Sequence, residues 1–174
     1  MRFQIWTVGH SNRSVETLLE ILRSVPIARL VDVRSYPRSK RNPQFDRDSL
    51  MWELEHAGLA YRHAPEVGGM RKPLPDSINT AIVEPGFRGY ADHMQTAEFN
   101  AGVERLIDEA VHSATAVMCA EASPWKCHRS FLADALSARG VAVLHLVDVD
   151  RAEAHEINPL ASVSGSSVTY PGLL

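Results

Sequence analysis

The chain alternates between short apolar runs rich in β-branched residues and longer segments whose apolar residues recur at helical spacing. The short runs predict strands at residues 3–8, 28–33, 59–63, 114–117 and 141–147. The longer segments predict helices at about 14–22, 48–57, 97–111 and 130–139, with Ser14 as a cap and Gly58 and Gly140 as stops. Strands that alternate with helices predict an α/β fold, with a mostly parallel sheet flanked by helices and joined by right-handed crossovers.

Length and composition fit one ordinary globular domain. A chain of 174 residues with 45% hydrophobic and 22% charged residues is long enough to bury a core, and from about residue 151 it continues as a polar tail. The net charge of −3 gives no global attraction to nucleic acid, so any such contact must use a local patch.

The sequence also predicts where the protein works. No apolar run approaches the ~20 residues that span a bilayer, and the amino terminus has no signal-peptide pattern. Two cysteines make no disulfide framework. We therefore expect a cytoplasmic protein without a membrane partner.

Polar residues fall repeatedly where predicted strands end. They are His10, Ser11 and Asn12, then Asp32 with Arg34 and Ser35, then His63, and finally Cys119 with Glu121. In a parallel sheet the carboxyl ends of the strands share one edge, where ligands bind in open α/β folds. The sequence therefore predicts one polar site at the carboxyl ends of the strands.

The segment 118–129 lies between a predicted strand and a predicted helix. A helix amino terminus offers unpaired N–H groups and partial positive charge, which favour an anion. Lys126, His128 and Arg129 add full or titratable positive charge at the same place. This spacing predicts an anion site.

Four ordered motifs carry a resemblance to a known family. They are residues 7–12, residues 32–39, Tyr61-Arg62-His63 with Gly68-Gly69, and Met118-Cys119-Ala120-Glu121 with Cys127-His128-Arg129. Together they resemble the DUF488 family, over the chain from Thr7 to about Leu146. The resemblance implies a compact α/β fold and leaves the reaction open, because the family is a domain of unknown function.

Two arginines are candidates to hold the anion. A guanidinium binds phosphate or carboxylate through two hydrogen bonds, which suits Arg34 and Arg129 at the predicted pocket edges. The alternative is a structural ion pair with Asp32 or Glu121. Nearby, Arg38, Lys40 and Arg41 form a basic loop, either simply solvated or a nucleic-acid patch that includes Tyr36.

His10 and Glu121 are the candidate acid–base groups. A carboxylate at the end of an apolar strand can exchange a proton near neutrality, or it can orient a histidine or arginine instead. Tyr61 and His63 are expected to form another wall of the pocket. The Gly- and Pro-rich stretch 66–89 is expected to be irregular and to act as a lid or to be partly disordered.

The cysteines support a different chemistry. Cys127, beside basic residues at a helix start, is a candidate reactive thiol, with a structural helix-start residue as the alternative. Cys119 ends a buried strand and is expected to be a small core residue. These cysteines with His63 and His128 lack the spacing of a metal site, so we predict neither a metal nor a cofactor.

The sequence thus favours an enzyme that acts on a phosphate-bearing substrate, either a nucleotide or a nucleic acid, by hydrolysis or glycosidic cleavage. Two alternatives remain open. One is a non-catalytic module that binds nucleotide or nucleic acid, and the other is a cysteine-dependent enzyme that uses Cys127.

Overall fold

The computed structural model describes residues 3–173. Its strands are β1 (Gln4–Gly9), β2 (Arg29–Asp32), β3 (Ala60–His63), β4 (Thr115–Cys119), β5 (Ala142–Asp148), β6 (Arg151–Ala154), β7 (Ser162–Ser164) and β8 (Ser167–Thr169). Its α-helices are α1 (Val15–Arg23), α2 (Arg47–His56), α3 (Pro85–His93), α4 (Ala97–His112) and α5 (Arg129–Ala138). Short 3-10 helices cover Pro43–Phe45, Pro65–Val67 and Pro124–Lys126.

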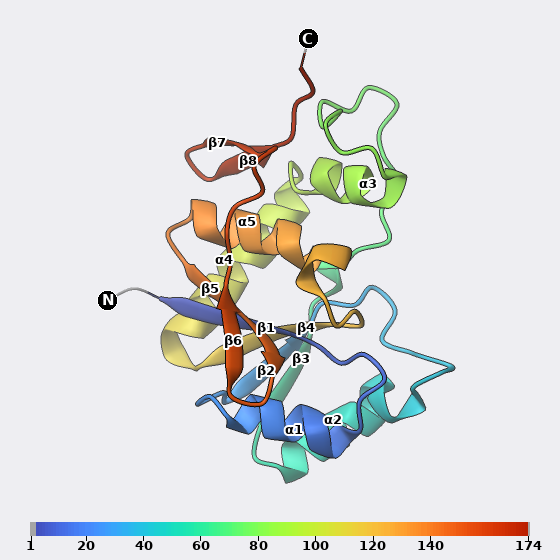
Figure 1. Cartoon of the computed structure of the whole chain (residues 1–174), viewed down its shortest axis with the longest axis vertical. Helices are drawn as coiled ribbons and strands as arrows, with labels where there is room; N and C mark the ends of the chain where they lie inside the picture. The colour runs from blue at the N-terminus through green and yellow to red at the C-terminus, as the bar shows by residue number, and fades with distance from the viewer. Residues whose placement is uncertain (1–2, 174) are drawn as a thin grey trace.

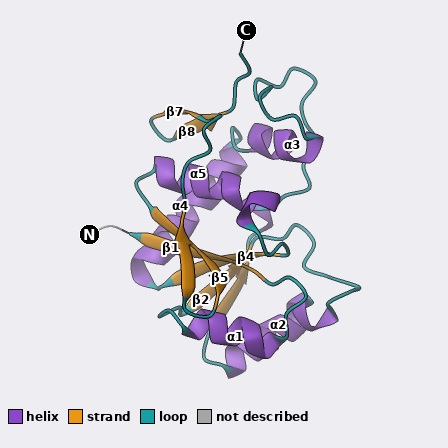
Figure 2. Cartoon of the chain, viewed as in Figure 1, coloured by secondary structure: helices purple, strands orange, loops and turns teal. Residues whose placement is uncertain are grey.

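Within the described residues, strands β1 to β6 form one sheet in the order β3-β2-β4-β1-β5-β6 (Figure 1). Every pairing among the first five is parallel, and β6 adds to the edge of β5 in the antiparallel sense. Helices cover both faces of the sheet, as Figure 2 shows. The predicted α/β fold with a mostly parallel, helix-flanked sheet is therefore confirmed.

Two apolar cores hold the layers together. On one face, Leu18 of α1 and Leu54 of α2 pack with Val8 of β1. On the other, Val103 of α4 and Leu132 of α5 pack with residues of the same sheet. Since successive residues of a strand point to opposite faces, a strand that is apolar throughout can serve both cores.

Helix starts follow the capping pattern of the sequence. The Ser14 side chain accepts a hydrogen bond from the Thr17 amide and begins α1, as predicted. The Thr96 hydroxyl does the same for the Phe99 amide at the start of α4. The connection from β1 to α1 is thereby fixed close to the end of the strand.

The irregular stretch predicted to extend to Gly89 ends earlier. Helix α3 begins at Pro85, where the Glu84 side chain accepts from the Phe87 amide at 2.6 Å. Gly86 and Gly89 weaken the helical signal in the sequence, but burial of Tyr90 in the core stabilises the helix. Tertiary packing therefore outweighs local propensity here.

The polar tail is also more ordered than its composition indicates. Strand β6 joins the main sheet, and β7 and β8 form a separate hairpin. Val168 and Tyr170 are buried against the core beside α5. The tail is therefore part of the fold.

Candidate functional site

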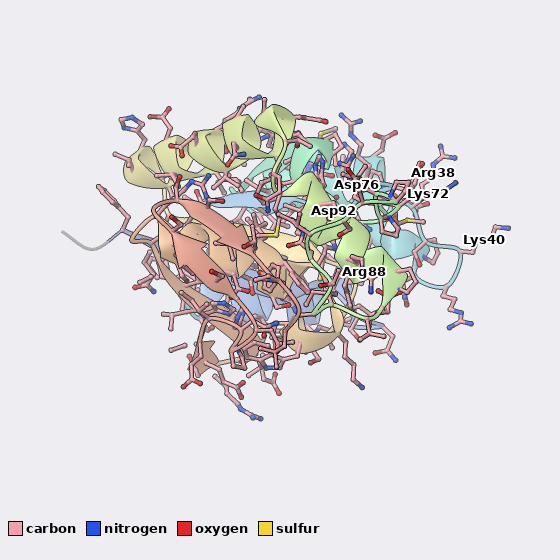
Figure 3. All side chains as sticks on the ribbon, turned by 90° about the horizontal axis from the view of Figure 1, so that it is seen from above. Arg38, Lys40, Lys72, Asp76, Arg88 and Asp92 are labelled. Atoms are coloured by element: carbon pink, nitrogen blue, oxygen red, sulfur yellow. The ribbon has the colours of Figure 1, made fainter. Side chains whose placement is uncertain are left out.

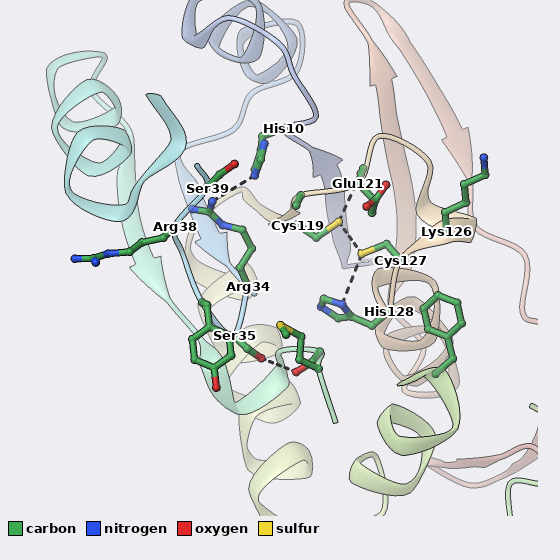
Figure 4. Close-up of a pocket in the computed structure, with 15 residues that line it drawn as sticks. His10, Arg34, Ser35, Arg38, Ser39, Cys119, Glu121, Lys126, Cys127 and His128 are labelled. Atoms are coloured by element: carbon green, nitrogen blue, oxygen red, sulfur yellow. Dashed lines mark hydrogen bonds between the residues drawn. The ribbon is translucent and has the colours of Figure 1, made fainter. Parts of the chain in front are cut away.

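A pocket lies at the carboxyl ends of β1, β2 and β4. The chain leaves β1 for α1 on one face of the sheet and leaves the adjacent β4 for α5 on the other. Connections that diverge in this way open a crevice at a topological switch point, where ligands bind in α/β sheets. The pocket has a volume of about 290 Å³, and Figure 4 shows its lining.

Most of the predicted site residues line this pocket. They are His10, Arg34, Ser35, Glu121, Lys126, Cys127 and His128. The other predicted site residues lie outside its lining: Ser11, Asn12, Tyr61, His63 and Arg129. The structure thus brings together residues that follow three different strands.

Arg34 is held by a buried carboxylate. Its Nε and Nη2 donate to the two oxygens of Asp32, at 2.8 and 2.7 Å, and Nη2 also donates to the Phe45 carbonyl at 2.7 Å. Burial lowers the pKa of Arg34, but the hydrogen bonds and the charge of Asp32 raise it by more, so the pKa of Arg34 is raised overall. Of the two ion-pair partners considered for Arg34, the structure has Asp32.

His10 shares the remaining guanidinium nitrogen. Arg34 Nη1 lies 3.3 Å from His10 Nε2, and His10 Nδ1 lies 2.8 Å from the Ser11 carbonyl oxygen. A carbonyl only accepts, so Nδ1 carries the proton and Nε2 accepts from Arg34. Burial, with a smaller contribution from the Arg34 charge, lowers the pKa of His10. The imidazole is therefore neutral at neutral pH.

Tyr61 and His63 support this pair from behind. The Tyr61 hydroxyl donates to Asp32 Oδ2 at 2.6 Å, and His63 Nε2 donates to the Arg34 carbonyl at 2.6 Å. Both side chains therefore position Arg34 rather than form the predicted pocket wall. They act on any ligand only through Asp32 and Arg34.

The two thiols lie in contact at the pocket lining. Cys127 Sγ donates to Cys119 Sγ at 2.7 Å, and the Arg129 amide donates to Cys127 Sγ at 3.4 Å. Burial raises the pKa of Cys119, but the Cys127 hydrogen bond and the Arg129 charge lower it by more, so its net direction is downward. The same hydrogen bond, together with burial, raises the pKa of Cys127.

This assignment differs from the sequence-based expectation. Cys127 is at the helix start as predicted, but its proton is directed to Cys119, and Cys119 is the sulfur that better carries the charge. The role of Cys127 as a reactive thiol stays a prediction, and the structure adds a second thiol within hydrogen-bonding distance of it. Cys119 also lines the pocket, beyond its predicted role in the core.

His128 adds a neutral ring beside the thiols. Its Nδ1 lies 3.7 Å from Cys127 Sγ, and a Cβ added at Gly69 would lie 2.6 Å from the same nitrogen. Burial lowers the pKa of His128 to about 4, more than a backbone contact with Val33 raises it. Position 69 therefore has to be glycine for the His128 ring to lie beside the thiols.

Arg129 has a structural position. Its guanidinium is fully buried and donates from Nη2 to the carbonyls of Glu121 and Ala122, at 3.0 and 3.1 Å. Nη1 donates to the Thr7 hydroxyl at 3.3 Å. Arg129 thus fixes the backbone that carries Glu121 instead of lining the pocket as an anion clamp.

Exposed charges surround the pocket. Lys126 and Glu121 lie on the loop after β4, and Arg38 lies on the loop after β2. Figure 3 shows Arg38, Lys40 and Lys72 on the same side of the molecule. Sequence reasoning placed Arg38 only in a basic loop, although its position after a strand end could have indicated a lining residue.

The segment after β3 contributes an apolar wall. Gly69 and Met70 line the pocket together with Phe87 of α3, and the Ser35 hydroxyl donates to the Gly69 carbonyl at 2.6 Å. No local pattern in the sequence indicated Met70 or Phe87, because they reach the site only through the long connection between β3 and α4.

That connection is anchored by Asp92. Its carboxylate accepts from the Leu74 amide at 2.8 Å, from the Ser77 hydroxyl at 2.6 Å and from Asn79 Nδ2 at 2.8 Å. A buried carboxylate with three donors holds the segment in one conformation. The expected lid is thus an anchored wall in this structure.

A second buried polar network lies beside the site. His155 Nε2 donates to Asp134 Oδ1 at 2.7 Å, His145 Nε2 lies 2.9 Å from His155 Nδ1, and His145 Nδ1 lies 2.6 Å from the Thr7 hydroxyl. The Tyr170 hydroxyl donates to Asp134 Oδ2 at 2.6 Å. This Asp134 network joins the tail to β1, β5 and α5.

Residues 3–173 hold neither an evident metal site nor a membrane-spanning helix. In that part of the chain, no group of three His, Cys, Asp or Glu side chains is arranged to hold a metal ion. None of its helices has the length and apolar character needed to cross a bilayer.

By its fold and site, the chain is an open α/β protein with a pocket at the topological switch point that thiols and basic side chains line. The family model "Domain of unknown function DUF488" matches residues 14–136, and the chain belongs to this family. The resemblance seen in the sequence motifs is therefore confirmed, although β1 with His10 and the tail lie outside the matched range. No curated protein and no solved structure matches the chain.

Proposed function

We propose that this protein is an enzyme that acts on a phosphate-bearing substrate, with single-stranded nucleic acid as the favoured class. The observation that carries the proposal is the contact between Arg34 Nη1 and a neutral His10 in a pocket that Arg38 and Lys126 also line. One group offers charge to an anion, and the other offers a base at the same position.

Three cations support recognition of phosphate. Asp32 and the Phe45 carbonyl hold the other guanidinium nitrogens of Arg34, so its geometry is fixed before a ligand binds. Arg38 and Lys126 are exposed and can adapt to the substrate. A fixed guanidinium with mobile partners suits an anion that enters from solvent.

His10 suits the role of acid–base group. Its Nε2 lone pair becomes available when Arg34 Nη1 donates to a substrate oxygen in place of His10, and its lowered pKa keeps it unprotonated at neutral pH. Glu121, exposed on the opposite loop, is the second candidate proton carrier. This pair would support hydrolysis or cleavage of a glycosidic bond.

The surroundings favour a polymer over a free nucleotide. A groove of about 1020 Å³ shares Tyr36, Arg38 and Ser39 with the pocket. Its charged lining is three basic residues and two acidic ones: Arg38, Lys40, Arg47, Asp46 and Asp48. Tyr36 is 71% exposed between the groove and the pocket. Exposed aromatic rings beside basic residues bind single strands through stacking and phosphate contacts.

The binding part is tested with a fluorescent single-stranded oligonucleotide and titration by anisotropy. Arg38→Ala and Lys126→Ala should each weaken binding by roughly tenfold and lower the salt dependence by about one phosphate contact. Arg23→Ala, an exposed arginine of α1 outside the pocket, is the matched control and should bind normally. Equal affinity in all four proteins would overturn the proposal.

The catalytic part is tested with His10→Gln, which retains a polar side chain of similar reach. We expect the oligonucleotide affinity to remain within about threefold of the unchanged protein and turnover of the bound substrate to be lost. Turnover that persists would exclude His10 as the base. Binding without turnover in the unchanged protein would instead favour the non-catalytic binding module.

The thiols favour a second candidate, an enzyme with a cysteine nucleophile. In the contact between the thiols Cys127 Sγ donates to Cys119 Sγ, which supports Cys119 as the attacking thiolate and Cys127 as its proton donor. Iodoacetamide should then label Cys119 before Cys127, with the order read by peptide mass spectrometry. Labelling of Cys127 first would return the role to that residue, and inertness of both would exclude this candidate.

A further inference from the structure

The two cysteines sit on supports that fix their separation. Cys119 is the last residue of β4, a buried central strand, and Cys127 caps the turn that leads into α5. Because the Arg129 amide donates to Cys127 Sγ, the sulfur cannot swing away without losing that contact. Their Sγ atoms lie 2.7 Å apart, so an approach of roughly 0.7 Å more would reach the covalent S–S length of about 2.05 Å.

A small reagent can reach the pair only through the pocket. Cys119 is 1% exposed and Cys127 is 5% exposed, and both line the 290 Å³ pocket. A hydroperoxide the size of hydrogen peroxide fits this volume. The chemistry therefore points to a small diffusible oxidant.

We propose that Cys119 and Cys127 form a reversible disulfide on reaction with a hydroperoxide, so that the pocket contains a two-electron redox centre. The geometry that carries the proposal is the thiol–thiol contact between two fixed elements. This inference goes beyond the proposed function and does not depend on it.

The reaction has two balanced steps. The Cys119 thiolate attacks the nearer peroxide oxygen and breaks the O–O bond; with one proton, the leaving oxygen becomes water and Cys119 becomes a sulfenic acid. The Cys127 sulfur then attacks the Cys119 sulfur, its thiol proton joins the leaving hydroxide, and a second water and the disulfide result. A small dithiol reductant returns both thiols by exchange.

The roles of the two cysteines are unequal. Cys119 Sγ accepts from Cys127, donates to the Glu121 carbonyl at 3.6 Å and lies near the buried Arg129 charge, so we expect it to be the sulfur that attacks the peroxide. Cys127 holds the proton and resolves the sulfenic acid. The order of reaction is therefore a consequence of the direction of one hydrogen bond.

The test treats the folded, reduced protein with a small excess of hydrogen peroxide, followed by alkylation, trypsin and mass spectrometry. Cleavage after Lys126 and Arg129 separates the cysteines, so the disulfide joins peptide 106–126 to peptide 127–129. We expect this linked pair to form, the titratable thiols to disappear, and dithiothreitol to restore them.

Single variants keep the proposal falsifiable. In Cys127→Ser, Cys119 should stop at a sulfenic acid that dimedone traps; in Cys119→Ser, Cys127 should stay reduced at the same peroxide dose. A linked pair that forms only after urea unfolding would overturn the proposal. So would oxidation of Cys119 directly to sulfinic acid in the unchanged protein, because a resolving thiol in contact would prevent it.

Discussion

The Asp32 and Asp134 networks are built alike and end differently. Each centres on a buried carboxylate that accepts a tyrosine hydroxyl at 2.6 Å, from Tyr61 in one and from Tyr170 in the other. The Asp134 network runs through two histidines and Thr7 to Arg129, whose Nη2 donates to backbone carbonyls while its buried Nε has no partner in the described part of the chain. The Asp32 network runs through Arg34 to His10, whose Nδ1 donates to the Ser11 carbonyl, and both Arg34 and His10 line the pocket.

The difference separates stability from availability. A buried polar group costs free energy unless it has a partner, so a closed network holds the elements that supply its members. The Asp134 network joins the tail to the sheet in this way. In the Asp32 network, the hydrogen bonds of Arg34 Nε and Nη2 fix the guanidinium, and Nη1 and His10 Nε2 can exchange partners. A ligand can therefore use the second network and not the first.

Asp134→Asn is the substitution that should destabilise the Asp134 network most. The amide replaces one acceptor oxygen with a donor, which faces either His155 Nε2–H or the Tyr170 hydroxyl. Loss of a buried carboxylate from a satisfied network should lower the unfolding free energy by about 3 kcal/mol, measured by urea denaturation.

Oxidation of the thiol pair in that variant serves as the control, measured at low temperature where the protein remains folded. We expect the Cys119–Cys127 link to form as before, because Asp134 is not in the pocket lining. A variant with normal stability would mean that the tail is not held by this network.

Acidification tests the same network through His145. Burial lowers the pKa of His145 to about 3, against about 6.5 in an unfolded chain. Between these values the unfolded state binds the extra proton, so the unfolding free energy falls as the pH falls. From pH 7 to pH 5 the contribution of His145 is a loss of about 2 kcal/mol.

The measurement is urea denaturation at pH 7 and pH 5 for the unchanged protein and for His145→Gln. The variant should be less stable at pH 7 but should lose less on acidification, since its titrating group is gone. His10 and His128 also have lowered pKa values, so some acid sensitivity should remain. Parallel losses in the two proteins would remove His145 from the account.

The sheet and the pocket position could be predicted because both follow from local pattern and one topological rule. Strand periodicity located β1 to β5, and the shared edge of parallel strands predicted that His10, Arg34 and Glu121 would lie near one another. Ser14 and Gly58 marked helix ends through backbone chemistry alone. Each of these inferences needs only neighbouring residues and the direction of the chain.

The rest depends on contacts between distant segments. The sequence neighbours of Cys127 predict an acidic thiol. Its hydrogen bond to Cys119, however, depends on how the loop between the two residues folds back. Arg129 looked like an anion clamp, but its side chain turns inward to the carbonyls it can reach. His155 meets Asp134 only because β6 reverses the chain. Sequence spacing does not contain these distances.

The matched variants Tyr170→Phe and Tyr61→Phe compare the same hydrogen bond in the two networks. Each substitution removes one hydroxyl that donates to a buried carboxylate at 2.6 Å, and changes little else. Tyr170 is fully buried, and its loss leaves Asp134 with donors on one oxygen, so we expect a cost of about 1.5 kcal/mol. Tyr61 is half-buried, and Arg34 still donates to both oxygens of Asp32, so the cost should be about 0.5 kcal/mol. Urea denaturation at pH 7 resolves the two values. Tyr61→Phe should also leave unchanged which thiol reacts first. Equal costs at the two sites would mean that the Asp32 network is as closed as the Asp134 network and that Arg34 Nη1 cannot exchange His10 for a ligand.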